Sequence, residues 1–553
     1  MNKTALLLLV AALSATAGAG KKPKHPDEVR GELTTAEFRE FDPEDVVKGG
    51  TVVLPLLADV DSFNPYLSSS GEADNVNKYL YPLPLIEHAD YYNDMPTFTP
   101  DLVDRYEIDG LELKMHIRED AVWSDGTPIT SADFRFSWEA ARNKDVAWPG
   151  FYITQFQEDL EVVDAKNFIL HYTEPTIYMV MNAKDWRIIP KHIFGKVPFK
   201  EWKSYKHWDQ IASVVSGPYR VQSYKHNEEF VLVPNEKYWH KDRPRIQKVV
   251  FRVIKSQQTQ FEALLSGEID SMPRVPPKDV RRILDDRRLR LYTYMDRAYE
   301  YVGWNCKSPL FGDPEIRLAM TLAIDRQNIA ESNYYGYAKV TASPIITTLW
   351  ACDRSIEPHP FDPDAAEEIL DRKGWKKGKD GLRTRDGTRF EFRLSTNSGN
   401  LRRQATVQMV QADLREIGIE VHPSFIDFNS MTEKLKQGKI DAWVGGWFSA
   451  TFVDPTSTFH TQGIGFRNYS LYSNARVDEL IEKGRGKPKE VSLPIWSEFQ
   501  RILHREQPYT ILYEPRGLNA FDKKLYNVES NALDYWFNLD EWFIPTGKQK
   551  MTR

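Results

Sequence analysis

The sequence predicts an α/β fold with at least two lobes, and three observations support this. Short runs typical of strands alternate with segments of helical periodicity, and strand–helix–strand units recur through the second half of the chain. The chain has 553 residues, enough for several domains. Its hydrophobic fraction of 41% is sufficient for large cores, and it shows no repeat of fixed period and no low-complexity tract.

The predicted strands are β-branched or alternate between apolar and polar residues. They cover 51–57, 111–117, 229–233, 248–254 and 419–421. The predicted helices have apolar residues at helical spacing, and those over 260–265, 364–370 and 401–417 end near glycine. They cover 130–141, 260–265, 313–335, 364–370 and 401–417, and the first begins with a capping-box-like pair, Thr130 and Asp133.

The N-terminus has the anatomy of a cleaved secretory signal over residues 1–20. Lys3 is followed by the apolar run Ala5–Leu13 and by small residues with two A-x-A patterns. The apolar run is too short for a membrane span, and no Cys follows it that would carry a lipid anchor. We therefore expect a secreted, soluble mature protein, periplasmic where an outer membrane exists. Residues 21–47, charged and Pro-containing, are predicted to be a flexible leader.

Charge and motifs narrow the function. The net charge of −6 favours neither nucleic acid nor an anionic membrane as a partner. The sequence contains no H-E-x-x-H, G-x-S-x-G or C-x-x-C motif, so we expect no catalytic residues, no metal site and no cofactor. A secreted hydrolase that uses dispersed carboxylates is the enzymatic alternative. Aromatic residues make up 12% of the chain, which fits either core filling or an aromatic-lined cleft.

The two cysteines, Cys306 and Cys352, are predicted to form one disulfide, because free thiols are a liability in an oxidising compartment. The alternative is two separate buried thiols.

Five blocks carry a resemblance to a known family, and they occur in the family's order. They are Gly49–Val52 with Phe63-Asn64-Pro65; Leu113–Asp133 continuing into Phe136–Glu139; Gly217–Tyr219 with Pro234–Trp239; Arg317–Ala319 with Ala323–Arg326; and Asp441–Trp447 followed by Asp454-Pro455. In these blocks the chain resembles the family 5 bacterial solute-binding proteins, which are the receptors of peptide and nickel ABC importers. The resemblance extends from about residue 49 to about residue 545.

The resemblance implies a periplasmic-binding-protein-like fold (class II, cluster C) with two hinged lobes and an extra inserted domain. The first lobe would consist of 48–96, 212–303 and 515–553, the inserted domain of 97–211 and the second lobe of 304–514. The ligand would lie between the lobes, which close by hinge motion.

The resemblance also implies a function. The protein would be a monomer that captures a peptide-like solute and delivers it to an ABC permease in the membrane. Two alternatives keep the binding role: a non-peptide ligand such as an oligosaccharide or a metal chelate, or a sensory module that presents its ligand to a membrane receptor.

Trp443 and Trp447 are the leading ligand-binding candidates. They flank Val444-Gly445-Gly446 in a predicted strand, where glycine allows close approach of a ligand. In the family this strand and the following loop line the cleft. Period two places both rings on one face of the strand, so core packing is the alternative for each.

The loop after this strand departs from the family. Peptide-binding members commonly have an Asp three residues after the Trp, where it meets the ligand's α-amino group, but here the position is Ala450. Asp454 is a candidate replacement, although an acid before Pro is also a turn feature. The change places recognition of a free peptide amino terminus in question.

Five further residues complete the predicted site. Phe63 and Asn64 lie on a loop that the family places at the cleft, although Asn before Pro also favours an Asx turn. Asn397 lies at a strand–loop–helix junction, where its alternative role is helix capping. Tyr299 and Trp304 lie near the predicted crossing between the lobes.

Overall fold

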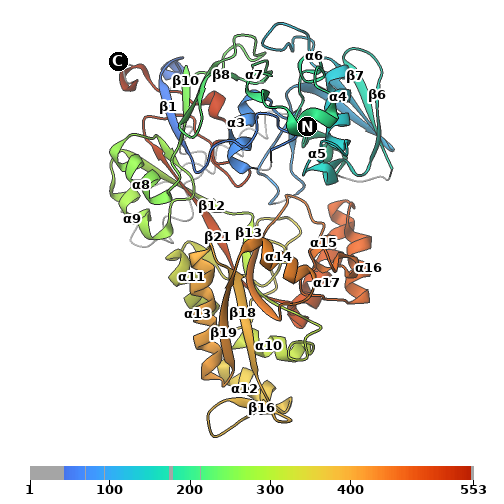
Figure 1. Ribbon diagram of the computed structural model, residues 1–553, viewed down its shortest axis with the longest axis vertical. Helices are drawn as coiled ribbons and strands as arrows, with labels where there is room; N and C mark the ends of the chain where they lie inside the picture. Colours follow the sequence, from blue (N-terminus) through green and yellow to red (C-terminus); the bar gives the residue numbers. More distant parts are fainter. Residues whose placement is uncertain are drawn as a thin grey trace, which may run out of the picture.

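The computed structural model describes residue 41 and residues 43–68, 70–92, 94–173, 178–211 and 213–549. The predicted signal peptide and the leader up to residue 40 lie outside this range. The described chain is a mixed α/β molecule with an upper and a lower half (Figure 1). No helix in the described ranges combines the length and the apolar character that a membrane span needs.

The upper half contains a four-stranded sheet that brings distant segments together. Its order is β1 (Thr51–Leu56), β10 (Lys248–Val253), β9 (Glu229–Pro234) and β8 (Tyr219–Lys225). β1 and β10 are parallel, and the other pairs are antiparallel. Helix α3 (Gly71–Leu80) contacts this sheet, and the ring of Tyr79 stacks on Phe251 with centroids 6.2 Å apart.

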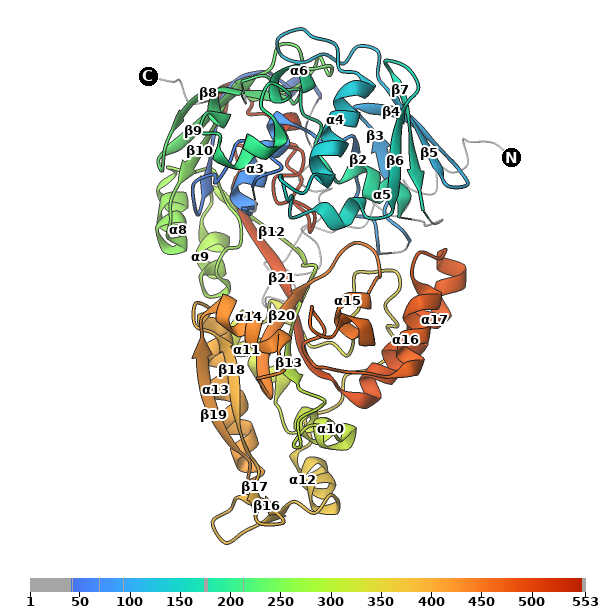
Figure 2. The same cartoon turned by 45° about the vertical axis from the view of Figure 1, so that its right-hand side comes forward.

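A second, antiparallel sheet lies beside the first in the upper half (Figure 2). Its order is β4 (Val103–Asp109), β5 (Glu112–Ile117), β7 (Asn167–Tyr172) and β6 (Gln157–Val162). Helix α4 (Ser131–Arg142) contacts β6 and starts with the predicted capping box of Thr130 and Asp133. The upper half also contains the ribbon of β2 (Leu85–Glu87) and β3 (Phe98–Pro100), and the short helices α5 (Met179–Lys184), α6 (Lys191–Phe194) and α7 (Trp208–Ile211).

The largest sheet runs from the lower half to the upper half. Its main order is β11 (Ser271–Met272), β21 (Tyr509–Asp522), β13 (Ala298–Trp304), β20 (Ala442–Phe448), β18 (Glu391–Asn397) and β19 (Glu420–Ile426). β12 (Leu289–Met295) and β14 (Ala338–Lys339) also pair with β21. β21 pairs with β13 through its first residues and with β12 through its last, and Figures 1 and 2 both show β12 and β21 connecting the halves.

Helices cover the lower part of this sheet and flank the crossing. They are α8 (Gln257–Ser266), α9 (Val280–Asp285), α10 (Pro314–Leu322), α11 (Arg326–Tyr334), α12 (Pro363–Arg372), α13 (Leu401–Glu416), α14 (Phe428–Lys436), α15 (Thr456–Phe459), α16 (Ala475–Gly484) and α17 (Lys489–Glu506). A small ribbon of β15 (Lys376–Lys377), β16 (Arg383–Arg385) and β17 (Thr388–Arg389) lies at the lower tip.

Most predicted elements are present, with one difference in the helices. The pattern over 313–335 predicts one helix, but the chain forms α10 and α11, separated at Ala323–Asp325. The side chain of Asp325 accepts a hydrogen bond from the amide of Asn328 and caps α11, which starts a new helix. The predicted segment boundaries remain predictions, and two of them, 303/304 and 514/515, fall inside the continuous strands β13 and β21.

Candidate functional site

A cavity of about 1700 Å³ lies between the two halves. Its upper wall includes residues of β2, α3 and α5, and its lower wall includes the end of β20 and the loop and helix that follow. The halves touch at its edge: the Tyr178 hydroxyl donates to the Val453 carbonyl at 2.9 Å, and the Trp350 amide donates to the Tyr91 carbonyl at 2.9 Å. Typical small-molecule pockets measure about 300–1000 Å³, so this space suits a larger ligand.

Trp447 lines the cavity, whereas Trp443 does not. Trp447 is half-buried and stacks on Tyr469 with centroids 5.6 Å apart. Trp443 is 1% exposed and packs edge-on against Tyr301 and Tyr509. Both rings share one face of β20, as period two predicts, but only the end of the strand reaches the cavity. Trp443 is therefore a core residue.

Of the two candidates on β13, one lines the cavity and the other lies in the core. Tyr299 pairs with Trp447 across the sheet and lines the cavity. Trp304 is fully buried, packs against Phe311 at 4.8 Å, and donates its indole N–H to the hydroxyl of Thr510. Residues 299 and 304 differ by an odd number, so their side chains point to opposite faces of the sheet. Trp304 therefore belongs to the core behind the strand.

The candidates near the N-terminus lie in the upper core and do not line the cavity. Phe63 packs against Tyr224 and Phe230, with centroids 5.1 and 5.5 Å apart. Asn64 is fully buried, and its side-chain oxygen accepts a hydrogen bond from the amide of Tyr66 at 3.0 Å. This is the Asx-type turn that the sequence left open as the alternative.

Asn397 also lies away from the cavity lining. Its side-chain oxygen accepts a hydrogen bond from Arg403 at 3.3 Å, and Arg403 forms an ion pair with Glu300 at 2.7 Å. The cap of α13 is Asn400, whose side chain accepts from the Arg403 amide. Asn397 therefore helps to hold an arginine at the strand–helix junction.

Asp454 and Ala450 both line the cavity and are exposed. The Asp454 carboxylate accepts a hydrogen bond from the Thr456 amide at 3.0 Å and a second from the Thr456 hydroxyl, so the acid has the turn role expected before Pro455. Its exposed side also leaves it available to a ligand.

Three charged residues of the upper wall were not predicted from the sequence. The ammonium of Lys184 forms ion pairs with Glu87, at 2.7 Å, and with Asp185. Burial disfavours the charge of Lys184, but the two carboxylates outweigh it and raise the pKa of the ammonium. Burial raises the pKa of the Asp185 carboxyl, and Lys184 opposes this shift. No motif marks these residues, because Glu87 and Lys184 meet only through the fold.

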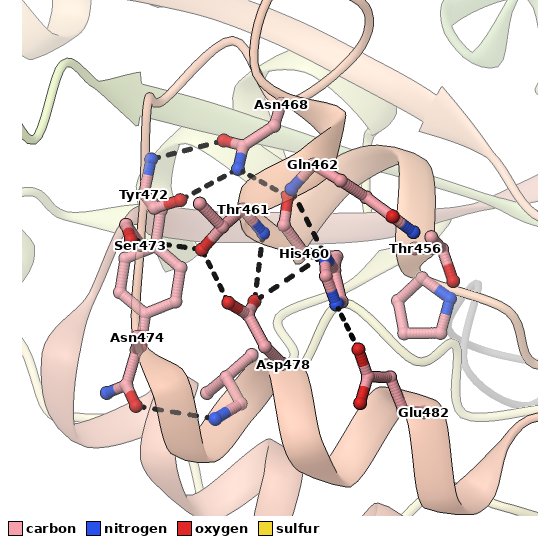
Figure 3. Close-up of polar contacts among 12 residues, drawn as sticks. Thr456, His460, Thr461, Gln462, Asn468, Tyr472, Ser473, Asn474, Asp478 and Glu482 are labelled. Carbon is pink, nitrogen blue, oxygen red and sulfur yellow. Dashed lines mark hydrogen bonds and ion pairs between the residues drawn. The ribbon is translucent and has the colours of Figure 1, made fainter.

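A network of polar residues holds the cavity wall that follows α15 (Figure 3). The amide of Gln462 donates to Nδ1 of His460 at 3.0 Å, so the ring proton is on Nε2, which donates to Glu482 at 3.2 Å. Asp478 on α16 accepts from the amide of Thr461 at 2.8 Å and from its hydroxyl at 2.6 Å. The network fixes the segment that carries Gln462 to the helix behind it.

The prediction of a disulfide is wrong for this structure, in which Cys306 and Cys352 are free. Cys306 follows β13, and its backbone amide donates a hydrogen bond to the Ser470 carbonyl. Cys352 lies in a loop, and the carbonyl of the preceding residue, Ala351, accepts a hydrogen bond from the Gln500 side chain. Different neighbours hold the two segments. Burial raises the pKa of the Cys306 thiol to about 11 and that of Cys352 to about 12, so both remain protonated at neutral pH.

Among the described residues, one group has metal-ligand spacing: Glu391, Glu420 and His422, on the neighbouring strands β18 and β19. Both carboxylates and the imidazole lie outside the cavity lining. Exposed acidic groups of this kind are common on protein surfaces, and this group plays no part in the cavity.

Comparisons with known proteins agree with this geometry. Residues 97–469 match the family described as bacterial extracellular solute-binding proteins, family 5 Middle. The chain is 28% identical to the oligopeptide-binding protein AppA of Bacillus subtilis over 563 residues, which cover 98% of this chain and 99% of AppA. Its structure is similar to that of Bacillus subtilis AppA in complex with a nonapeptide, with a TM-score of 0.74 and 25% identity over 90% of this chain and 99% of AppA.

The fold is also that of CtaP, an ABC transporter substrate-binding protein of Listeria monocytogenes, with a TM-score of 0.78 and 20% identity over 90% of this chain and 100% of CtaP. The predicted two-lobed periplasmic-binding-protein fold is thereby confirmed. Proteins of this family are transport receptors without enzymatic activity, which confirms that the chain is not an enzyme. This chain belongs to the family 5 bacterial extracellular solute-binding proteins.

Proposed function

We propose that this chain captures peptide-like solutes outside the cytoplasm and delivers them to the permease of an ABC importer. The observation that carries the proposal is the cavity of about 1700 Å³ between two halves that are connected by the strands β12 and β21. Two lobes on a few crossing strands can open to admit a ligand and close around it.

The chemistry of the lining suits a ligand with both apolar and polar groups. Tyr299 and Trp447 offer aromatic contact area at low entropic cost. Charged side chains lie on both walls, and a roomy cavity allows water to bridge the groups that do not meet directly. The similarity to AppA, which binds a nonapeptide in its solved structure, supports a peptide-like ligand.

Export is part of the proposal. The signal anatomy of residues 1–20 predicts a mature chain that begins near Lys21 and acts as a soluble monomer, in the periplasm where an outer membrane exists. N-terminal sequencing of the mature protein should find a start near residue 21, and an intact or acylated N-terminus would contradict this step.

Native mass spectrometry of protein purified without denaturation tests the function, because the cavity can retain its ligand. We expect adducts that tandem fragmentation identifies as peptides, and their disappearance after unfolding in urea and refolding. If protein freed of ligand in this way takes up nothing from a peptide mixture, the proposal fails.

A non-peptide solute, such as an oligosaccharide or a metal chelate, is the second candidate. The observation that favours it is Ala450, which is exposed in the cavity and carries no charge at the position where the family resemblance implies an acid in peptide-binding members. An adduct whose fragments contain no amino acids would establish this candidate. Sensing rather than import would show as signalling that persists when the permease is deleted.

A further inference from the structure

The group of Glu87, Lys184 and Asp185 has an excess of one negative charge when all three are ionised. Two carboxylates share the single ammonium of Lys184, whose side chain is 6% exposed. The side chain of Glu87 is 11% exposed and that of Asp185 is 31% exposed, and all three residues line the cavity. Asp185 is therefore the member that opens most toward the ligand space.

The hydrogen bonds of Glu87 and Asp185 also indicate that Asp185 is the carboxylate available to a ligand. One oxygen of Glu87 accepts from Lys184 at 2.7 Å, and the other accepts from the Thr451 hydroxyl of the lower half at 2.7 Å. The Oδ1 atom of Asp185 contacts Lys184, and among the described residues no donor contacts its Oδ2 atom. Glu87 is thus engaged on both oxygens, whereas Asp185 keeps one acceptor for a ligand.

The group that contains Asp185 contacts the lower wall next to residue 450, where the sequence departs from the family. Thr451, which donates to Glu87, directly follows Ala450, and both line the cavity. Ala450 on the lower wall is therefore adjacent to Thr451, whose hydroxyl contacts Glu87 of the acidic group on the upper wall.

The charges of the two walls have opposite signs. Among the described lining residues before 250 and after 520, carboxylates outnumber Lys and Arg by nine to four. Among those from 297 to 499, three arginines face a single acid, Asp454. A ligand cation is attracted to the upper wall, and there the unoccupied oxygen of Asp185 can accept a charge-assisted hydrogen bond.

We propose that Asp185, held by Lys184 beside Glu87, is the subsite that binds a cationic group of the captured solute, and that for a peptide-like ligand this group is its ammonium. The inference rests on the proposed function and adds the side of the cleft from which the ligand cation is held. The acid comes from the upper wall instead of from position 450.

The test uses synthetic nonapeptides without Lys, Arg or His, each prepared with a free and with an acetylated amino terminus, so that the α-amino group is the only cation. Ligand-free wild type, D185N and D90N are each mixed with both forms of a peptide, so that the two forms compete for the cavity. Native mass spectrometry then measures the ratio of bound free peptide to bound acetylated peptide. Asp90 provides the matched control: its exposed carboxylate lines the same wall but accepts hydrogen bonds from Thr97. D185S is made in parallel, so that the result does not depend on the folding of one variant.

We expect wild type and D90N to prefer the free form by at least tenfold, and D185N and D185S to lose this preference while binding acetylated peptides as wild type does. An unchanged preference in both folded Asp185 variants overturns the inference and leaves peptide capture standing. The inference is also overturned if wild type binds both forms equally. If wild type binds neither form, peptide capture itself fails, and this outcome is visible before any variant is compared.

Discussion

Replacing Trp447 and Trp443 in turn by Ala separates ligand binding from core packing within one strand. The two rings lie on the same face of β20, opposite Tyr299 and Gly303 of β13. Trp447 is half-buried at the cavity, whereas Trp443 is 1% exposed. The pair therefore keeps the substitution and the strand constant and changes only the surroundings.

The structure gives different magnitudes for the two changes. A Cβ added at Gly303 would come within 2.3 Å of the Trp443 ring, which shows how closely the ring packs on the strand behind it. Removing a buried Trp from such a core costs about 3–5 kcal/mol of unfolding free energy. Trp447 stacks on Tyr469 and also lines the cavity. Its loss should cost about 2 kcal/mol of binding free energy, a roughly thirty-fold rise in Kd.

Urea unfolding measures the first quantity, and titration calorimetry on the folded fraction, with a peptide identified in the native adduct, measures the second. We expect W443A to lose stability and to keep its affinity per folded molecule, and W447A to show the reverse. If W447A keeps wild-type affinity and loses as much stability as W443A, both tryptophans are core residues and the ligand does not contact this strand.

Three further predictions concern groups outside the ligand contacts. Burial raises the pKa of Glu514 to about 7, so wild type should lose up to about 3 kcal/mol of unfolding free energy as pH rises from about 4.5 to 7. Urea titrations of E514Q should not show this loss. If wild type and E514Q lose stability in parallel over this pH range, the prediction is refuted. Burial, and the charge of His359, whose ring centroid lies 3.9 Å away, lower the pKa of His504 to about 4. The unfolding free energy should therefore fall as pH drops from about 6.5 to 4, and H504Q should show a smaller fall. An unchanged fall in H504Q would show that His504 is not its source. Protein unfolded without reductant should titrate two thiols, Cys306 and Cys352, per chain; detecting none before reduction would restore the disulfide.

Local pattern was sufficient to predict most of the elements. The alternation in 111–117 and the capping pair of Thr130 and Asp133 became β5 and the start of α4, because both signals depend on neighbours along the chain. The break between α10 and α11 was missed because the helical pattern continues through the capping residue Asp325.

The site was less predictable, because its residues meet only in the fold. Period two placed Trp443 and Trp447 on one face, but how far the cavity extends along β20 depends on the opposing half. Nothing in the sequence around Glu87, Lys184 or Asp185 marks a site, since the three come together from β2 and the end of α5. The turn alternatives for Asn64 and Asp454 could be stated beforehand, yet only the observed hydrogen bonds show that each residue has the turn role.

In the proposed function, the solute is held in the cavity between the two halves. A crystal structure of the protein with a peptide identified in its native adduct tests this most directly. We expect continuous ligand density between the halves, in contact with Trp447 on the lower wall and with the peptide's amino group within hydrogen-bonding distance of Asp185 on the upper wall. Ligand density outside this cavity, with the space between the halves empty, would contradict it.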